Sequence, residues 1–220
     1  MQSTVIYDAV RSPRARAKTT GSLHSVSGHE ILKQHYHGLG ERTVLTFSDI
    51  EEVMLGCVTQ QGEQAGNIAR SPVLYSGLPD HVPGLTVNRY CSSGIDAIAL
   101  AALKIQQGMM CCAVAGGVEM MSRVPMLSDG ARIFTDSEFA LQCRTLLMGS
   151  GADLIASAHN VSRDEADQIA LQSQQRAALA QRRGFFDGSI LPIETPTAIA
   201  DSDQCIRADT SLESLASLPP

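Results

Sequence analysis

Short apolar runs alternate with helical segments through the first half of this 220-residue chain. Residues 53–58 and 111–118 are almost free of polar side chains and contain glycine, which is typical of strands covered on both faces. Residues 92–108, which lie between these runs, form an Ala- and Ile-rich helical pattern. A strand, a helix and a second strand in this order predict a crossover between parallel strands, so the sequence predicts an α/β fold.

Alternation and capping residues predict the remaining elements. Residues 4–10 alternate like a strand, and residues 85–90 read as extended. A helix is expected over residues 27–37, with Ser27 as its N-cap and Glu30 completing a capping box. Further helices are expected over residues 66–77, 152–159 and 163–183, and a short edge strand over residues 189–193.

The apolar period is lost after Glu119, and the chain reads as irregular up to residue 146. We therefore predict a first domain over residues 1–119 and a second, α-rich domain over residues 120–220. The long helix of the second domain is expected to start with a capping box that pairs Ser162 with Glu165.

Charge and composition exclude several classes of protein. The net charge of −6 argues against a sequence-independent grip on nucleic acid, which needs basic clusters. No apolar run is long enough for a membrane span, and the start of the chain does not resemble a signal peptide, so a cytoplasmic protein of bacterial type is expected. The six cysteines form no C-x-x-C pair, so neither a metal site nor a disulfide framework is predicted.

Cys91 has the most reactive predicted setting of these cysteines. It joins an extended segment to an apolar helix, and the positive end of a helix dipole favours the nucleophilic thiolate over the thiol. Ser92, Ser93 and Gly94 are small and leave room for an acyl group. A thiolate that attacks a thioester forms an acyl-enzyme. A buried cysteine used as a small apolar side chain fits the spacing equally well, and this second reading is the one expected for Cys57, Cys111 and Cys112.

The segment Asn-Arg-Tyr-Cys-Ser-Ser-Gly at residues 88–94, together with Ala-Gly-Gly-Val-Glu-Met-Met-Ser at residues 115–122, resembles the nucleophile region of thiolases. Other segments resemble the same family in the same order, namely residues 11–13, 56–60, 67–70, 173–177, 184–186 and 207–219. The resemblance implies a thiolase-like fold, with a mixed, mainly parallel sheet, helices on both of its faces and an inserted α-rich loop domain. It covers only the front of a thiolase, so the C-terminal half, with its His, Asn and second Cys, is expected to be absent.

The same resemblance implies a reaction and a set of site residues. Cys91 would take an acyl group from a 3-oxoacyl-CoA and pass it to CoA with release of acetyl-CoA, in lipid degradation, or run the reverse condensation. Met148, Arg207 and Ser214 would contact CoA. Acyl-CoA is then a substrate, no cofactor is permanently bound, and the full-length protein is a homodimer or homotetramer.

Two other readings stay open. The chain lacks the later thiolase motifs, so it could be a catalytically incomplete module for binding or assembly. It could also belong to an acetoacetyl-CoA thiolase or to a ketosynthase-like condensing enzyme, since these share the fold and the cysteine.

Overall fold

The computed structural model describes residues 3–219, and the chain forms two compact units. The first unit comprises Met1–Asp129 and Ser189–Gln204, and the second comprises Gly130–Gly188 and Cys205–Pro220. This partition differs from the division after Glu119 expected from the sequence mainly because residues 189–204 pack with the first unit.

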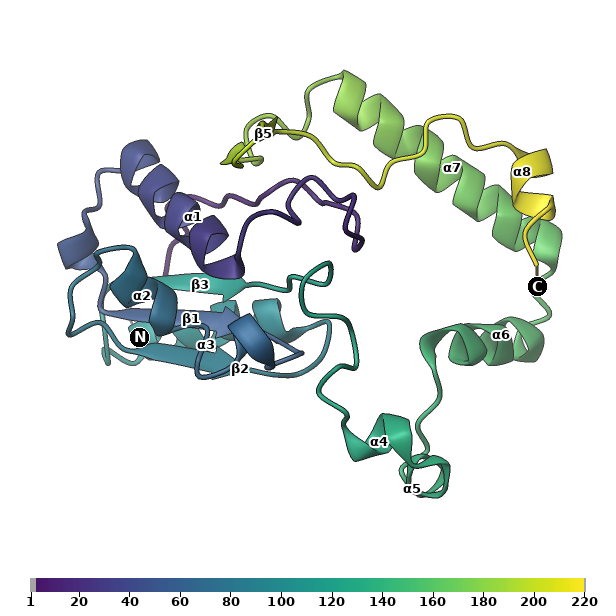
Figure 1. Cartoon of the computed structure of the whole chain (residues 1–220), viewed down its shortest axis with the longest axis horizontal. Coiled ribbons are helices and arrows are strands. Elements are labelled where there is room, and N and C mark those ends of the chain that lie inside the picture. Colours follow the sequence, from purple (N-terminus) through teal and green to yellow (C-terminus); the bar gives the residue numbers. More distant parts are fainter. Residues whose placement is uncertain (1–2, 220) are drawn as a thin grey trace. The chain divides into compact units, whose positions relative to one another are not determined.

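A three-stranded parallel sheet forms the centre of the first unit (Figure 1). Its strand order is β2-β1-β3, and Val53 of β1 lies opposite Gly84 of β2 and Val114 of β3. The strands are β1 (Glu52–Gly56), β2 (Gly84–Val87) and β3 (Ala113–Gly117). The parallel α/β sheet predicted from the sequence is confirmed. The antiparallel component is a separate two-stranded sheet of β4 (Ile193–Glu194) and β5 (Ile199–Ala200).

Side chains of β1 alternate between two apolar clusters, one on each face of the sheet. Val53 and Leu55 pack in a cluster with residues of α1 (Gly28–Arg42) and α2 (Ser71–Tyr75). Met54 points to the opposite face and packs against Ala97 and Ala101 of α3 (Ser93–Gln106). Helices therefore cover both faces of the sheet, as Figure 1 shows and as expected for a strand without polar alternation.

Helix α3 has apolar residues on two sides. Its buried residues are the small ones, Ser93, Ala97 and Ala101, so the helix axis lies close to the sheet. The stripe of larger side chains expected from the sequence faces outward, with Ile95 68% exposed and Leu103 54% exposed. The two sides of the helix thus differ in the size of their side chains more than in their polarity.

The strand expected over residues 4–10 is wrong for the described part of the chain. Residues 3–10 carry no strand, and Ile6 is 78% exposed. Only an isolated parallel bridge between Arg11 and Ile190 is found there. An alternating segment becomes a strand when a neighbouring backbone accepts its hydrogen bonds, and residues 3–219 place no such strand beside it.

The ends of α1 and α2 follow from local chemistry. The Ser27 hydroxyl accepts from the Glu30 N–H, as predicted, but the Glu30 carboxylate accepts from the Tyr75 hydroxyl at 2.9 Å instead of completing a capping box. This contact ties α1 to α2. Helix α2 is shorter than the predicted span because Pro72 lies in its first turn, the position where a missing N–H costs nothing.

Helices make up most of the second unit. Its longest helix, α7 (Arg163–Arg182), begins with the predicted capping box between Ser162 and Glu165. The Arg163 guanidinium donates to the Leu215 carbonyl oxygen at 2.6 Å and so joins α7 to the last helix. The other helices of this unit are α4 (Arg132–Thr135), α5 (Ser137–Gln142), α6 (Met148–Ala158) and α8 (Leu212–Ala216). Within residues 3–219, none of the helices combines the length and the hydropathy needed to cross a membrane.

Hydrogen bonds join the loop before α1 to residues 203–204. Asp203 accepts two hydrogen bonds from the Arg11 guanidinium, at 2.7 and 2.9 Å, and a third from the Arg14 N–H at 2.7 Å. Its neighbour Gln204 accepts from the backbone N–H of Ser22 at 2.9 Å. Because Asp203 is nearly buried, with its side chain 8% exposed, these bonds are shielded from water.

Replacing Asp203 by Asn should lower the free energy of unfolding by about 2 kcal/mol near neutral pH, because hydrogen bonds to a charged group are lost. The hydrogen bond from Arg11 holds the pKa of Asp203 below its usual value. The stabilisation is therefore present above the ordinary carboxyl pKa and is lost as the pH falls toward the lowered pKa of the folded state. Denaturant unfolding across this range should show the two proteins converging at low pH. The matched variant Asp201→Asn, in the same loop but exposed, should leave stability unchanged.

Replacing Gly56 by Ala should destabilise the first unit by about 1–3 kcal/mol through overpacking. A Cβ at Gly56 would lie 2.4 Å from the Ser93 carbonyl carbon and 2.5 Å from the Gly94 nitrogen, and backbone cannot move aside as a side chain can. Gly116 on the adjacent strand is the control, because a Cβ there meets nothing within 4 Å. Thermal unfolding of both variants measures the difference. Equal stabilities would contradict the close approach of α3 to β1.

Candidate active site

The carboxyl ends of the three parallel strands meet at one edge of the sheet. Cys57 follows β1 directly, Cys91 follows β2 after a short turn, and Glu119 follows β3. In open α/β sheets, ligands bind outside this edge. Two thiols and one carboxylate are therefore the chemically versatile groups in the region where a site is expected.

Cys91 lies immediately before Ser92, the N-cap residue of α3, and its side chain is exposed. The positive end of a 14-residue helix therefore lies beside an accessible sulfur. Within residues 3–219, none of the hydrogen bonds made by histidines reaches Cys91. The thiol thus has the access and the helix end that the sequence analysis expected.

Side chains hold the turn that carries Cys91. The buried Ser93 hydroxyl accepts from the Arg89 N–H at 2.8 Å and donates to the Tyr90 carbonyl oxygen at 2.6 Å. The Asn88 side chain accepts from the Tyr90 N–H at 3.0 Å. Tyr90 itself has a φ of 47°, in the left-handed region that bulky residues avoid. The sulfur therefore follows a strained residue that several hydrogen bonds keep in place.

One ion pair lies on the same turn. The Arg89 guanidinium donates to the Asp96 carboxylate at 3.1 Å, and Asp96 occupies the first turn of α3. The Arg89 side chain is 75% exposed, so the pair is largely solvated and its contribution to stability is small. Its effect is to place a positive charge near the negative charge that Asp96 brings to the helix start.

Cys57 lies at the same edge but in a different environment. It is 1% exposed, and burial, together with the nearby charge of Glu119, raises the pKa of its thiol to about 12. A thiol with such a pKa is almost wholly protonated near neutral pH and is a poor nucleophile. The core role predicted for Cys57 is confirmed.

The remaining cysteines occupy other segments of the chain. The core role predicted for Cys111 is wrong, because Cys111 is exposed. Cys112 is half-buried. Both cysteines precede β3, which begins only at Ala113. Cys143 and Cys205 are exposed and belong to the second unit. Of the two thiols that follow strands at the carboxyl edge, Cys91 alone is accessible.

Glu119 and the fully buried Gln64 organise the loop after β1. The Glu119 carboxylate accepts from the N–H groups of Val58 at 2.8 Å and Thr59 at 3.3 Å, and from the Gln64 amide at 2.9 Å. The Gln64 amide also donates to the Thr59 carbonyl oxygen at 2.7 Å, and its own oxygen accepts from the Met120 N–H. The segments that follow β1 and β3 are thereby locked together.

No role could be predicted for Asn88 or Glu119 from the sequence alone. Both belong to the segments that resemble the thiolase nucleophile region, and each follows the carboxyl end of a strand. Polar residues at that position in neighbouring parallel strands were the available signal. Their partners could not be predicted, because the bonds cross between loops far apart in the sequence.

The three residues assigned to CoA lie in the second unit, whereas Cys91 lies in the first. Met148 is the first residue of α6 and is 86% exposed. The Arg207 N–H donates to the Gln174 side chain at 2.8 Å, which fixes the backbone at Arg207 against α7. Ser214 belongs to α8, and its hydroxyl accepts from the Ser211 N–H at 3.0 Å within a capping box.

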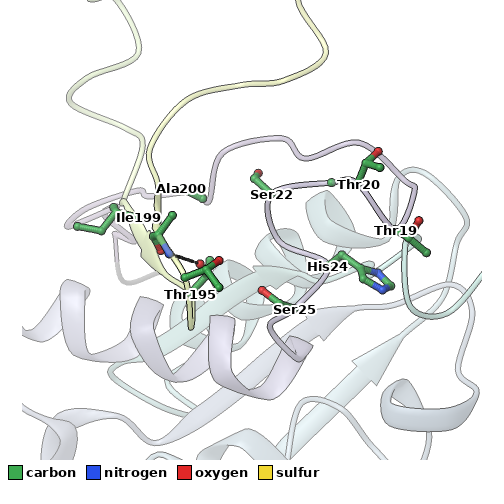
Figure 2. Close-up of a pocket in the computed structure, with 11 residues that line it drawn as sticks. Thr19, Thr20, Ser22, His24, Ser25, Thr195, Ile199 and Ala200 are labelled. Atoms are coloured by element: carbon green, nitrogen blue, oxygen red, sulfur yellow. Dashed lines mark hydrogen bonds between the residues drawn. The ribbon is translucent and has the colours of Figure 1, made fainter.

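A polar cavity of about 320 Å³ lies between the loop before α1 and the hairpin of β4 and β5 (Figure 2). Its lining combines apolar groups of residues 198–200 with residues that carry hydroxyl groups, namely Thr19, Thr20, Ser22, Ser25, Thr195 and Thr197. The Ser22 hydroxyl and the Nδ1 of His24 are buried and find no hydrogen-bond partner among residues 3–219. Such groups in a polar cavity suit ordered water. The residues that line this cavity do not include those of the turn that carries Cys91.

Comparison with known proteins supports one family. The family described as thiolase, N-terminal domain, matches residues 4–220. The chain is 38% identical to a β-ketoadipyl-CoA thiolase of Pseudomonas knackmussii, over 98% of the chain and 58% of that protein. It is 35% identical to a 3-ketoacyl-CoA thiolase of Chromohalobacter salexigens, over 98% of the chain and 56% of that protein.

A solved structure agrees with these relatives. The crystal structure of the Bacillus anthracis acetyl-CoA acetyltransferase superposes with a TM-score of 0.83 at 34% identity, covering 98% of this chain and 58% of that one. The chain thus spans somewhat more than half the length of the proteins it matches. With a matching family over nearly all of its residues and a matching fold, this chain belongs to the thiolase family, by way of its N-terminal domain.

Proposed function

We propose that this chain supplies the acyl-accepting nucleophile of a thiolase, and that Cys91 is that nucleophile. The Cys91 thiolate adds to the 3-oxo carbonyl carbon of a 3-oxoacyl-CoA, and the bond between C2 and C3 then breaks. The two-carbon fragment takes up a proton and leaves as acetyl-CoA, while the shortened acyl group stays on the sulfur. The thiol of a second CoA then attacks this thioester and releases a shortened acyl-CoA.

The exposure of Cys91 next to the start of α3 is the observation that carries the proposal. Developing negative charge on sulfur is stabilised at the positive end of a helix. The neighbouring residues, Ser92, Ser93 and Gly94, are small, so an acyl group can reach the sulfur without displacing bulky side chains. Burial of Cys57 removes the competing thiol at the same edge.

The names of the relatives support 3-oxoacyl-CoA thioesters as the substrate class. They include thiolases named for β-ketoadipyl-CoA and for 3-ketoacyl-CoA, both of which are 3-oxoacyl thioesters. We place the reaction in the degradative direction, in the breakdown of lipid acyl chains. Met148, Arg207 and Ser214 are proposed to contact CoA, with the Arg207 side chain facing its phosphates and the other two its pantetheine arm.

The proposal is tested by forming the acyl-enzyme directly. When the chain is incubated with acetyl-CoA, intact-mass and peptide analysis should find the acetyl group as a thioester on Cys91, formed about threefold or more faster than on Cys143, because the helix end stabilises the thiolate. The variant Cys91→Ser should lose this adduct, and the control Cys143→Ser should retain it. Acetylation at equal rates on both exposed thiols would remove the basis for a dedicated nucleophile.

The outward face of α3 supports self-association as part of the same proposal. Ile95 and Leu103 expose a contiguous apolar stripe that water solvates poorly. Sedimentation velocity at increasing concentration should therefore find dimers or larger species, and Ile95→Glu with Leu103→Glu should shift the population toward monomer. The control is Ile169→Glu, a similarly exposed position on α7, which should change nothing. A monomer at all concentrations would contradict this part.

A further inference from the structure

We propose that Asn88 and Glu119 are positioning residues that hold the thiol of Cys91 at the start of α3. They act through a continuous chain of hydrogen bonds that connects the ends of all three strands of the sheet. The inference rests on the proposed function, because it concerns how the nucleophile of that reaction is held.

The chain begins at Glu119, after β3. Its carboxylate accepts from the Val58 N–H at 2.8 Å, in the loop after β1. The buried Gln64 amide donates to the same carboxylate at 2.9 Å and fixes its orientation. The peptide groups at Val58 are therefore held in one place.

The second link passes from Val58 to the turn after β2. The Val58 carbonyl oxygen accepts from the Asn88 amide nitrogen at 3.2 Å, and the oxygen of the same amide accepts from the Tyr90 N–H at 3.0 Å. A single planar side chain thus spans from one loop to the residue before Cys91. Because an amide has both a donor and an acceptor, its contact with Val58 also sets which atom faces Tyr90.

These hydrogen bonds matter because the backbone at Tyr90 is strained. A φ of 47° is unfavourable for a bulky side chain, so the turn keeps this conformation only while its surroundings enforce it. Loss of the bond to the Tyr90 N–H lets the turn relax, and the sulfur of Cys91 then leaves the positive end of α3. Ser93 holds the same turn from the other side, but it belongs to the helix and to the buried packing beneath it.

The test measures alkylation of each thiol by iodoacetamide in the full chain, followed by mass spectrometry over a range of pH. Each thiolate forms a carbon–sulfur bond and releases iodide, so the rate reports the fraction and accessibility of the thiolate. The quantity compared is the rate at Cys91 divided by the rate at Cys143 in the same sample. A role limited to stability would shift thermal unfolding but leave this ratio unchanged in folded protein.

Asn88→Ala should lower the ratio about fivefold, as expected when the hydrogen bond to the Tyr90 N–H is lost. Glu119→Ala should lower it about twofold, because its effect passes through a second bond. Glu119→Gln should also lower the ratio, because when its amide oxygen accepts from Val58 its amide nitrogen faces the N–H donors of Thr59 and Gln64. Asn67→Ala and Glu63→Ala are matched controls in the same unit; they remove several hydrogen bonds outside this chain and should leave the ratio unchanged.

Two negative outcomes are distinguishable. A wild-type ratio near one would overturn the proposed function and this inference with it. A high wild-type ratio that persists in folded Asn88→Ala and Glu119→Ala would overturn only the positioning role. If Asn88→Ala does not fold, the two Glu119 variants decide, because an unchanged ratio in both contradicts the hydrogen-bond chain.

Discussion

The close approach of α3 to the sheet is the constraint on which the candidate site depends. Gly56 leaves no room for a side chain against the backbone at Ser93 and Gly94, and Gly117 faces the same contact from β3. Alanines continue the small surface along the helix. Because the backbones meet so closely, the first turn of α3 lies directly over the carboxyl edge of the sheet, and the preceding residue, Cys91, is presented there. A larger residue anywhere along this contact would move the sulfur together with the helix.

Elements whose sequence pattern reflects local chemistry were predictable. Strands β1 and β3 were expected from their apolar runs, and the start of α7 from its capping box. The segment at residues 4–10 was not, because alternation identifies a strand only where a partner strand lies beside it. The orientation of α3 was hidden because a helix with apolar residues on two sides does not indicate which side meets the sheet. Close packing selects the side with the small residues.

The candidate site divides in the same way. The position of Cys91 before a helix could be read from the chain, since it depends on neighbours in sequence. The core role of Cys57 could be predicted from its place in an apolar run, whereas the proposed roles of Asn88 and Glu119 required contacts between loops that lie 30 and 61 residues apart. Such contacts depend on the tertiary fold, so the local pattern indicated a candidate nucleophile but not the residues that surround it.

The left-handed backbone of Tyr90 has a thermodynamic consequence for the residue that follows it. A bulky side chain in this region costs about 1–2 kcal/mol, so the hydrogen bonds around the turn must offset that cost for the conformation to persist. The position of the sulfur beside the helix therefore depends on a neighbouring residue that keeps a conformation its own backbone disfavours.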